Sequence, residues 1–136
     1  MSSLLPLVEE ISPDWTPEAL FVRLAGRPHC VFLDSAMRHP HLGRYSFVAA
    51  DPFEYQELFE DGPDALAELA TRLEAFRTCS APGLPPFQGG AVGVFGYELA
   101  RQWEQLPKAR WNEFGLPVFA VGFYDIAAAF DHREGR

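Results

Sequence analysis

Few residues of this chain have the types and spacing that catalysis requires, and none of them forms a complete set. Asp34 and Ser35 place a carboxylate beside a hydroxyl, but the Gly-x-Ser-x-Gly sequence of serine hydrolases does not accompany them. Glu98 and Asp125 each follow a tyrosine, a neighbourhood in which structural carboxylates are commoner than catalytic acids. On residue chemistry alone, we therefore expect no assembled catalytic site.

A metal site and a nucleotide-binding loop are also disfavoured. His39 and His41 lie two residues apart, and no third ligand accompanies them at the spacing typical of metal sites. Residues 89–96 read Gly-Gly-x-x-Gly-x-x-Gly, which differs from the dinucleotide pattern Gly-x-Gly-x-x-Gly, and no Gly-Lys-Ser/Thr follows. Because these glycines interrupt an apolar run, we expect a strand whose backbone approaches a neighbour closely.

The elements that must position these residues are short, since 12 prolines and 11 glycines divide the chain. Thr16 and Pro17 form a helix-start signal, and the apolar stripe of residues 63–77 predicts a second helix. We expect a short helix over 99–105, one or two buried strands within 116–131, and further strands over 4–11, 29–33, 44–50, 53–59 and 87–98. We expect 53–59 to pair back on 44–50. Hairpins without βαβ alternation predict an α+β fold with largely antiparallel sheets and two or three helices.

Composition limits the partners. The chain is 48% apolar and 14% aromatic, which is enough to build a core, and its 11 basic against 19 acidic residues give a net charge of −8. That balance argues against nucleic acid or an anionic membrane as a partner. The chain has only two cysteines, which predicts reduced thiols. It has no apolar run near 18 residues and no basic leader, so we expect a cytoplasmic protein. The apolar run 118–130 suggests a final strand that expects cover, from a partner or a second copy.

Three ordered segments carry a resemblance to a known family. The first joins Phe-Leu-Asp-Ser-Ala at residues 32–36 to Gly-Arg-Tyr-Ser-Phe-Val-Ala-Ala-Asp-Pro at 43–52. The second, at 85–101, begins with Pro-Pro-Phe-Gln-Gly-Gly and ends with Gly-Tyr-Glu-Leu-Ala-Arg. The third, at 116–132, contains Phe-Tyr-Asp and ends with Phe-Asp-His. In this order they resemble the N-terminal region of anthranilate synthase component I and aminodeoxychorismate synthase component I. The resemblance covers residues 28–132 and implies that residues 1–136 are one domain, without the C-terminal chorismate-binding domain.

The resemblance implies a large α/β sandwich of which this chain is an incomplete part. The full aminodeoxychorismate enzyme aminates chorismate to 4-amino-4-deoxychorismate for folate synthesis, with Mg²⁺ and with ammonia from a glutamine amidotransferase partner. Its chorismate and Mg²⁺ residues lie in the C-terminal region, so this chain is expected to be inactive alone, with no catalytic residue, metal or cofactor of its own. Leu33-Asp34-Ser35, the short loop after it and Pro-Pro-Phe-Gln-Gly-Gly favour this branch; the anthranilate branch of tryptophan synthesis is the alternative.

A tryptophan-like pocket is also implied. Ser35 matches the serine of a Leu-x-Ser element, and Arg44, Tyr45 and Ser46 match an Arg-Tyr-Ser segment. A free amino acid needs acceptors for its ammonium, a role open to Asp34 and the hydroxyls, and a cation for its carboxylate. Alternatively, Tyr45 is a core residue and Arg44 a surface cation. A stand-alone tryptophan-binding module and a pure interaction module remain competing hypotheses.

Overall fold

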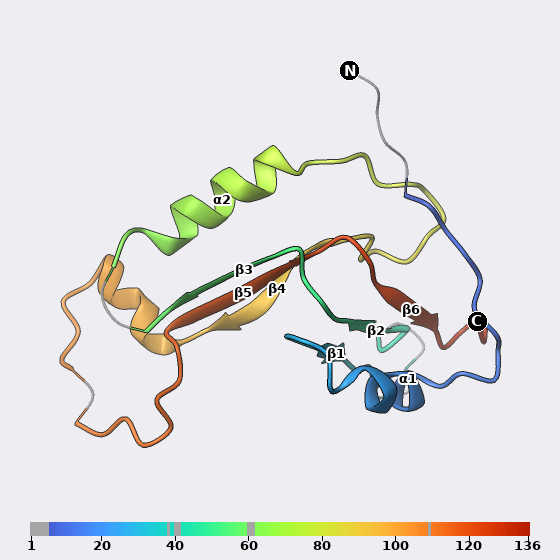
Figure 1. Ribbon diagram of the computed structural model, residues 1–136, viewed down its shortest axis with the longest axis horizontal. Coiled ribbons are helices and arrows are strands. Elements are labelled where there is room, and N and C mark those ends of the chain that lie inside the picture. Colours follow the sequence, from blue (N-terminus) through green and yellow to red (C-terminus); the bar gives the residue numbers. More distant parts are fainter. Residues whose placement is uncertain (1–5, 38, 40–41, 60–61, 109) are drawn as a thin grey trace.

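The computed structural model describes residues 6–37, 39, 42–59, 62–108 and 110–136. The chain forms two antiparallel three-stranded sheets, ordered β1-β2-β6 and β3-β5-β4. Figure 1 shows α2 lying over the second sheet and α1 beside the first. The elements are α1 (Pro17–Leu24), β1 (Val31–Leu33), β2 (Tyr45–Ala49), β3 (Glu54–Leu58), α2 (Ala65–Ala75), β4 (Gly90–Phe95), the 3-10 helix η1 (Tyr97–Gln102), β5 (Phe119–Tyr124) and β6 (Ala128–Asp131). The predicted α+β class with antiparallel sheets is confirmed.

Both α-helices begin at the capping residues that their sequences offer. The Thr16 side chain accepts a hydrogen bond from the Ala19 N–H at 3.2 Å, and Pro17 occupies the first turn of α1. At α2, the Asp64 carboxylate accepts from the Ala67 N–H at 3.0 Å. Each cap satisfies a donor that the helix itself leaves free, so the local sequence fixes where each helix starts.

Two strand predictions are wrong. Residues 6–11 form no strand; Pro6 supplies no backbone N–H, and Leu7 is 90% exposed. The other two predicted strand residues, Leu4 and Leu5, lie outside the described residues. β3 forms as expected but pairs with β5 of the second sheet. It cannot pair with β2, because β1 and β6 already occupy both edges of that strand.

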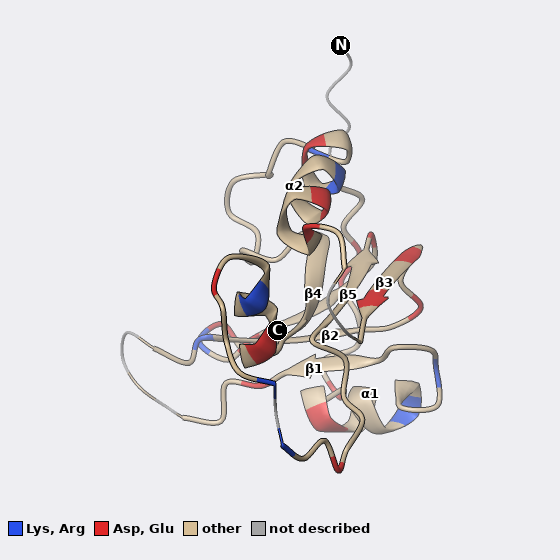
Figure 2. Cartoon of the chain, turned by 90° about the vertical axis from the view of Figure 1, so that its left-hand side faces the viewer, with Lys and Arg blue, Asp and Glu red and all other residues tan. Residues whose placement is uncertain are grey.

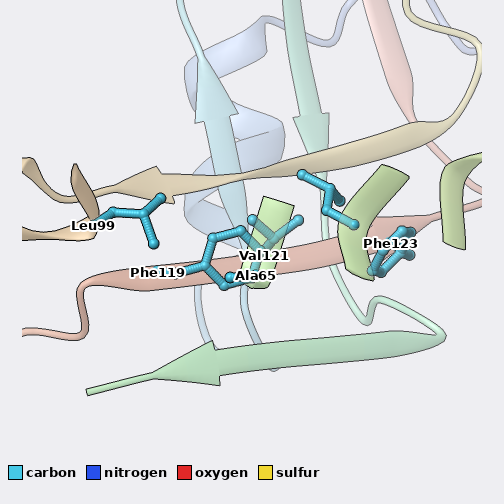
Figure 3. Close-up of a cluster of buried hydrophobic side chains, with 6 residues drawn as sticks. Ala65, Leu99, Phe119, Val121 and Phe123 are labelled. Carbon is cyan, nitrogen blue, oxygen red and sulfur yellow. The ribbon is translucent and has the colours of Figure 1, made fainter. Parts of the chain in front are cut away.

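The apolar core lies between α2 and the second sheet. All six residues of β5 are buried, since β3 and β4 flank the strand and α2 covers it. Figure 3 shows side chains of β5 grouped with α2 and η1; the buried cluster is Ala65, Leu69, Leu99, Phe119, Val121 and Phe123. The predicted buried strands of 116–131 are therefore β5 and β6. The final strand of the run is β6, which lies at an edge of the first sheet, whereas β5 is the centre of the second.

The glycines of β4 let two backbones approach closely, as predicted. A Cβ at Gly93 would lie 2.7 Å from the Cα of Val121 on the neighbouring strand, closer than real side chains allow. Glycine is therefore required where β4 crosses β5. Neither strand carries a charged residue, as Figure 2 shows by their uniform colour.

The chain exposes more surface than a compact globule of its mass. Its accessible surface is 10339 Å², whereas a compact 15.2 kDa protein exposes roughly 7,100 Å². Large apolar side chains contribute to the excess, among them Val94, Tyr97, Trp111, Phe114 and Leu116, each more than half exposed. No helix in the described ranges is long and apolar enough to cross a membrane.

Candidate functional site

A buried hydroxyl organises the ends of the strands in the first sheet. Ser46, in the middle strand β2, is 0% exposed. Its Oγ lies 3.0 Å from the Ser35 backbone nitrogen, 3.0 Å from Asp34 Oδ1 and 2.7 Å from His132 Nε2. Asp34 and Ser35 follow β1, and His132 follows β6. The antiparallel order β1-β2-β6 therefore brings residues about a hundred positions apart to one hydroxyl.

The bonding capacity of Ser46 sets the role of each neighbour. A hydroxyl has one proton to donate and two lone pairs that accept. The proton goes to the Asp34 carboxylate, and the Ser35 N–H occupies one lone pair. The His132 Nε2 must then carry hydrogen and donate to the other lone pair. A hydroxyl that is buried and fully bonded in this way is unsuited to be a nucleophile, whereas Asp34 and His132 are exposed.

A second polar cluster lies beside the first. The Arg44 guanidinium donates to the Asp131 carboxylate, with Nε 3.0 Å from Oδ1 and Nη2 2.6 Å from Oδ2. The backbone N–H groups of Arg133 and Glu134 also donate to Oδ1. The hydrogen bonds from Arg44 are the main cause that lowers the pKa of the nearly buried Asp131 carboxyl from 3.8 to about 2. In return, Asp131 raises the pKa of Arg44.

The five predicted pocket residues divide between these clusters. Asp34, Ser35 and Ser46 come together, as expected for one site. Successive side chains of a strand point to opposite faces, so Tyr45 projects away from the Ser46 side. Arg44 lies over the Tyr45 ring, 4.8 Å from its centroid, and its charge is compensated by Asp131. Ligand binding by these residues stays a prediction.

Sequence reasoning missed the contributions of Asp131 and His132. The pair follows an apolar run and was visible only as part of the family motif Phe-Asp-His. Its importance depends on the β2–β6 register, in which Tyr45 pairs with Asp131. The His132 N–H continues that register by donating to the Arg44 carbonyl oxygen at 2.8 Å. Only knowledge of this long-range pairing would have indicated the two residues.

A shallow cavity adjoins this site on the side of α1. It has a volume of about 210 Å³ and is lined by the segment before α1, by β6 and by the turn after β6, including Trp15, Thr16, Phe130 and His132. Small-molecule pockets usually hold about 300–1,000 Å³, so this cavity alone is too small to enclose a drug-sized ligand. His132 therefore connects the buried Ser46 cluster with an open surface.

Two side chains join the first sheet to the second. The Tyr124 Oη, at the end of β5, donates a hydrogen bond of 2.6 Å to the His29 carbonyl oxygen just before β1. The His29 ring stacks on Tyr55 of β3 with ring centroids 3.5 Å apart. Burial raises the pKa of the Tyr124 phenol, so the hydroxyl keeps its proton for this bond at ordinary pH.

The residues that the structure describes offer no metal-binding set. No three of their His, Cys, Asp and Glu side chains group together as metal ligands would. His41 of the candidate pair His39 and His41 lies outside the described residues. Both cysteines are free: Cys30 is half-buried, and Cys79 is exposed rather than buried.

Comparison with known proteins identifies relatives of this chain. No family model matches it. The chain is 37% identical to anthranilate synthase component 1 of Streptomyces coelicolor, over 98% of this chain and 26% of that protein. It is 35% identical to aminodeoxychorismate synthase component 1 of Salmonella typhimurium, over 98% of this chain and 33% of that protein.

The fold agrees with these relatives. The crystal structure of anthranilate synthase component I from Streptococcus pneumoniae superposes with a TM-score of 0.54 at 22% identity, covering 96% of this chain and 30% of that one. The chain spans only about a third or less of the length of the curated relatives it matches. It is therefore a homologue, over nearly its whole length, of part of anthranilate synthase component I and aminodeoxychorismate synthase component I.

Proposed function

We propose that this chain is the N-terminal part of an aminodeoxychorismate synthase component I and supports the amination of chorismate by a C-terminal region outside it. The observation that carries the proposal is the match of 98% of the chain to a minor share of two component I relatives. The site geometry supports a structural role, because Ser46 is buried and its Oγ already bonds with Asp34, the Ser35 N–H and His132. The chain has a structural part in the reaction.

The aminodeoxychorismate branch is our preferred assignment. Relatives of both branches match with similar identity, 35% and 37%, so the preference rests on the sequence. Leu33-Asp34-Ser35 and the Pro-Pro-Phe-Gln-Gly-Gly run at 85–90 are the features that favour it. In this proposal, chorismate and Mg²⁺ bind to the C-terminal region, and a glutamine amidotransferase supplies ammonia. The free cysteines support a reducing, cytoplasmic location.

Product analysis tests this assignment. The chain alone, given chorismate, ammonia and Mg²⁺, should form no product. Mixed with an aminodeoxychorismate synthase component 1 from which the matching segment has been deleted, it should restore 4-amino-4-deoxychorismate formation. Because the C-terminal region of the relative determines the product, better restoration of an anthranilate synthase component 1 truncated in the same way would instead support the tryptophan branch. Turnover by the chain alone, or no restoration beside an active intact relative, would contradict the proposal.

A second candidate function is the binding of a tryptophan-like amino acid at the first sheet. The observation that favours it is the arrangement around Ser46, which holds the exposed Asp34 carboxylate beside Ser35. In this proposal, Asp34 and the Ser35 hydroxyl accept the ligand ammonium. The Arg44 guanidinium, whose side chain is 41% exposed beside Asp131, has further N–H groups and is our candidate donor to the ligand carboxylate.

Calorimetric titration with tryptophan tests this site. Asp34→Asn should weaken binding, because the variant loses the charge that attracts the ammonium. Asp125→Asn is a matched control, since Asp125 is also exposed but lies in the β5–β6 connection. No heat of binding, or equal weakening by both variants, would remove this candidate and leave the first proposal intact.

A further inference from the structure

Asp34 and Ser35, which carry the second candidate function, have little backbone pairing to hold them. They follow β1, a strand of three residues whose pairing with β2 ends at Leu33 and Phe47. Two hydrogen bonds tie them to the sheet, and both meet at the Ser46 Oγ. The Ser35 N–H donates to this oxygen at 3.0 Å, and Asp34 Oδ1 accepts from it at 3.0 Å. One side chain of β2 therefore places both residues.

Ser46 itself is not available to a ligand. It is 0% exposed, whereas Asp34 is exposed and Ser35 is half-buried. The Ser46 Oγ also has no bonding capacity left, since it donates one hydrogen bond and accepts two. A ligand at this surface therefore meets Asp34 and Ser35, and Ser46 lies behind them.

His132 determines which neighbour receives the hydroxyl proton of Ser46. Its Nε2 lies 2.7 Å from the Ser46 Oγ. If Nε2 lacked hydrogen, it would accept the single hydroxyl proton, and Asp34 Oδ1 would face an oxygen lone pair across 3.0 Å. With hydrogen on Nε2, the hydroxyl proton is left for Asp34. Oδ1 of that carboxylate is then held, while Oδ2, which no described residue bonds, stays open to a ligand ammonium.

We propose that Ser46 is a positioning residue of the tryptophan-like site, and that His132 assists it by leaving the hydroxyl proton to Asp34. The inference rests on the second candidate function, in which Asp34 accepts the ligand ammonium. Neither Ser46 nor His132 touches the ligand. Their effect is to order the Asp34 carboxylate before the ligand arrives, so that binding does not have to immobilise this side chain.

A double-mutant cycle, measured by calorimetric titration with tryptophan, tests the positioning role. Ser46→Ala should weaken binding about threefold to tenfold, because the ligand must then order the exposed Asp34 carboxylate itself. In an Asp34→Ala background no carboxylate remains to be positioned, so the same change should cost less than about twofold. Ser80→Ala, at an exposed loop serine, is the matched control and should leave the affinity unchanged. An equal loss in both backgrounds would show a merely structural Ser46 and overturn the proposal.

Nitrogen NMR of the His132 imidazole tests the direction of the hydrogen bonds in the unmodified chain, without a ligand and even if Ser46→Ala fails to fold. At about pH 8, above the usual titration range of histidine, we expect hydrogen on Nε2. Because its partner Ser46 is buried, this hydrogen should exchange with water at least about tenfold more slowly than in free histidine. Hydrogen on Nδ1 with a bare Nε2, or an unprotected Nε2 hydrogen, overturns the proposal. A chain that gives no heat with tryptophan would instead remove the tryptophan-like site itself.

Discussion

Both sheets are antiparallel, but the first gathers polar contacts and the second builds the apolar core. The first sheet, β1-β2-β6, has strands of three to five residues, and polar groups converge where its strands end. The second sheet, β3-β5-β4, has strands of five or six residues around a wholly buried β5. The apolar core therefore belongs mainly to the second sheet, whereas the candidate chemistry belongs to the first. We therefore expect substitutions in the second sheet to lower the free energy of unfolding more than substitutions in the first.

The largest expected effect is in the second sheet. Phe119→Ala removes a ring that is 2% exposed and contacts Phe95 edge-on at 5.5 Å. Emptying such a site should lower the free energy of unfolding by about 3–5 kcal/mol, measured by urea denaturation. Phe114→Ala, at a ring that is 83% exposed, should change it by less than about 0.5 kcal/mol. Equal losses would show that the core does not lie where we place it.

A smaller effect is expected at the centre of the first sheet. Ser46→Ala deletes the hydroxyl that accepts from the Ser35 N–H and donates to Asp34. The partly buried Ser35 N–H loses its partner, so we expect the free energy of unfolding to fall by about 1–3 kcal/mol. Ser80→Ala, at an exposed loop serine, is the control for the same measurement. A loss as large as that of Phe119→Ala would contradict the division between the sheets.

A third effect appears only in acid. The folded pKa of Asp131 is about 2, below its ordinary value of 3.8, so the ionised carboxylate stabilises the fold above roughly pH 4. This contribution, roughly 2 kcal/mol, is lost as the pH falls toward 2. Urea denaturation between pH 2 and 6 should show that loss, and Asp131→Asn should remove this part of the pH dependence. Asp125→Asn, at an exposed carboxylate, should keep the acid slope; a slope unchanged by Asp131→Asn would refute the ion pair's role.

Local signals in the sequence predicted the elements better than their partners. Thr16 and Pro17 mark the start of α1, and the glycines of β4 indicate the close approach to β5, because both depend on neighbouring residues. The partner of β3 depends on which edges of β2 are already taken, which no local pattern records. The Ser46 site has the same cause: Ser46 and His132 meet across 86 positions, through the register of β2 with β6.

Tyr124 connects the two sheets of the molecule. Its ring lies against Gly122 within the second sheet, while its hydroxyl holds the His29 carbonyl oxygen beside the first. The side chain therefore links the two sheets, and Tyr124→Phe would keep the packing of the ring but remove the hydrogen bond to His29. One tyrosine thus serves both sheets, its ring packing within the second and its hydroxyl bonding to the chain just before the first.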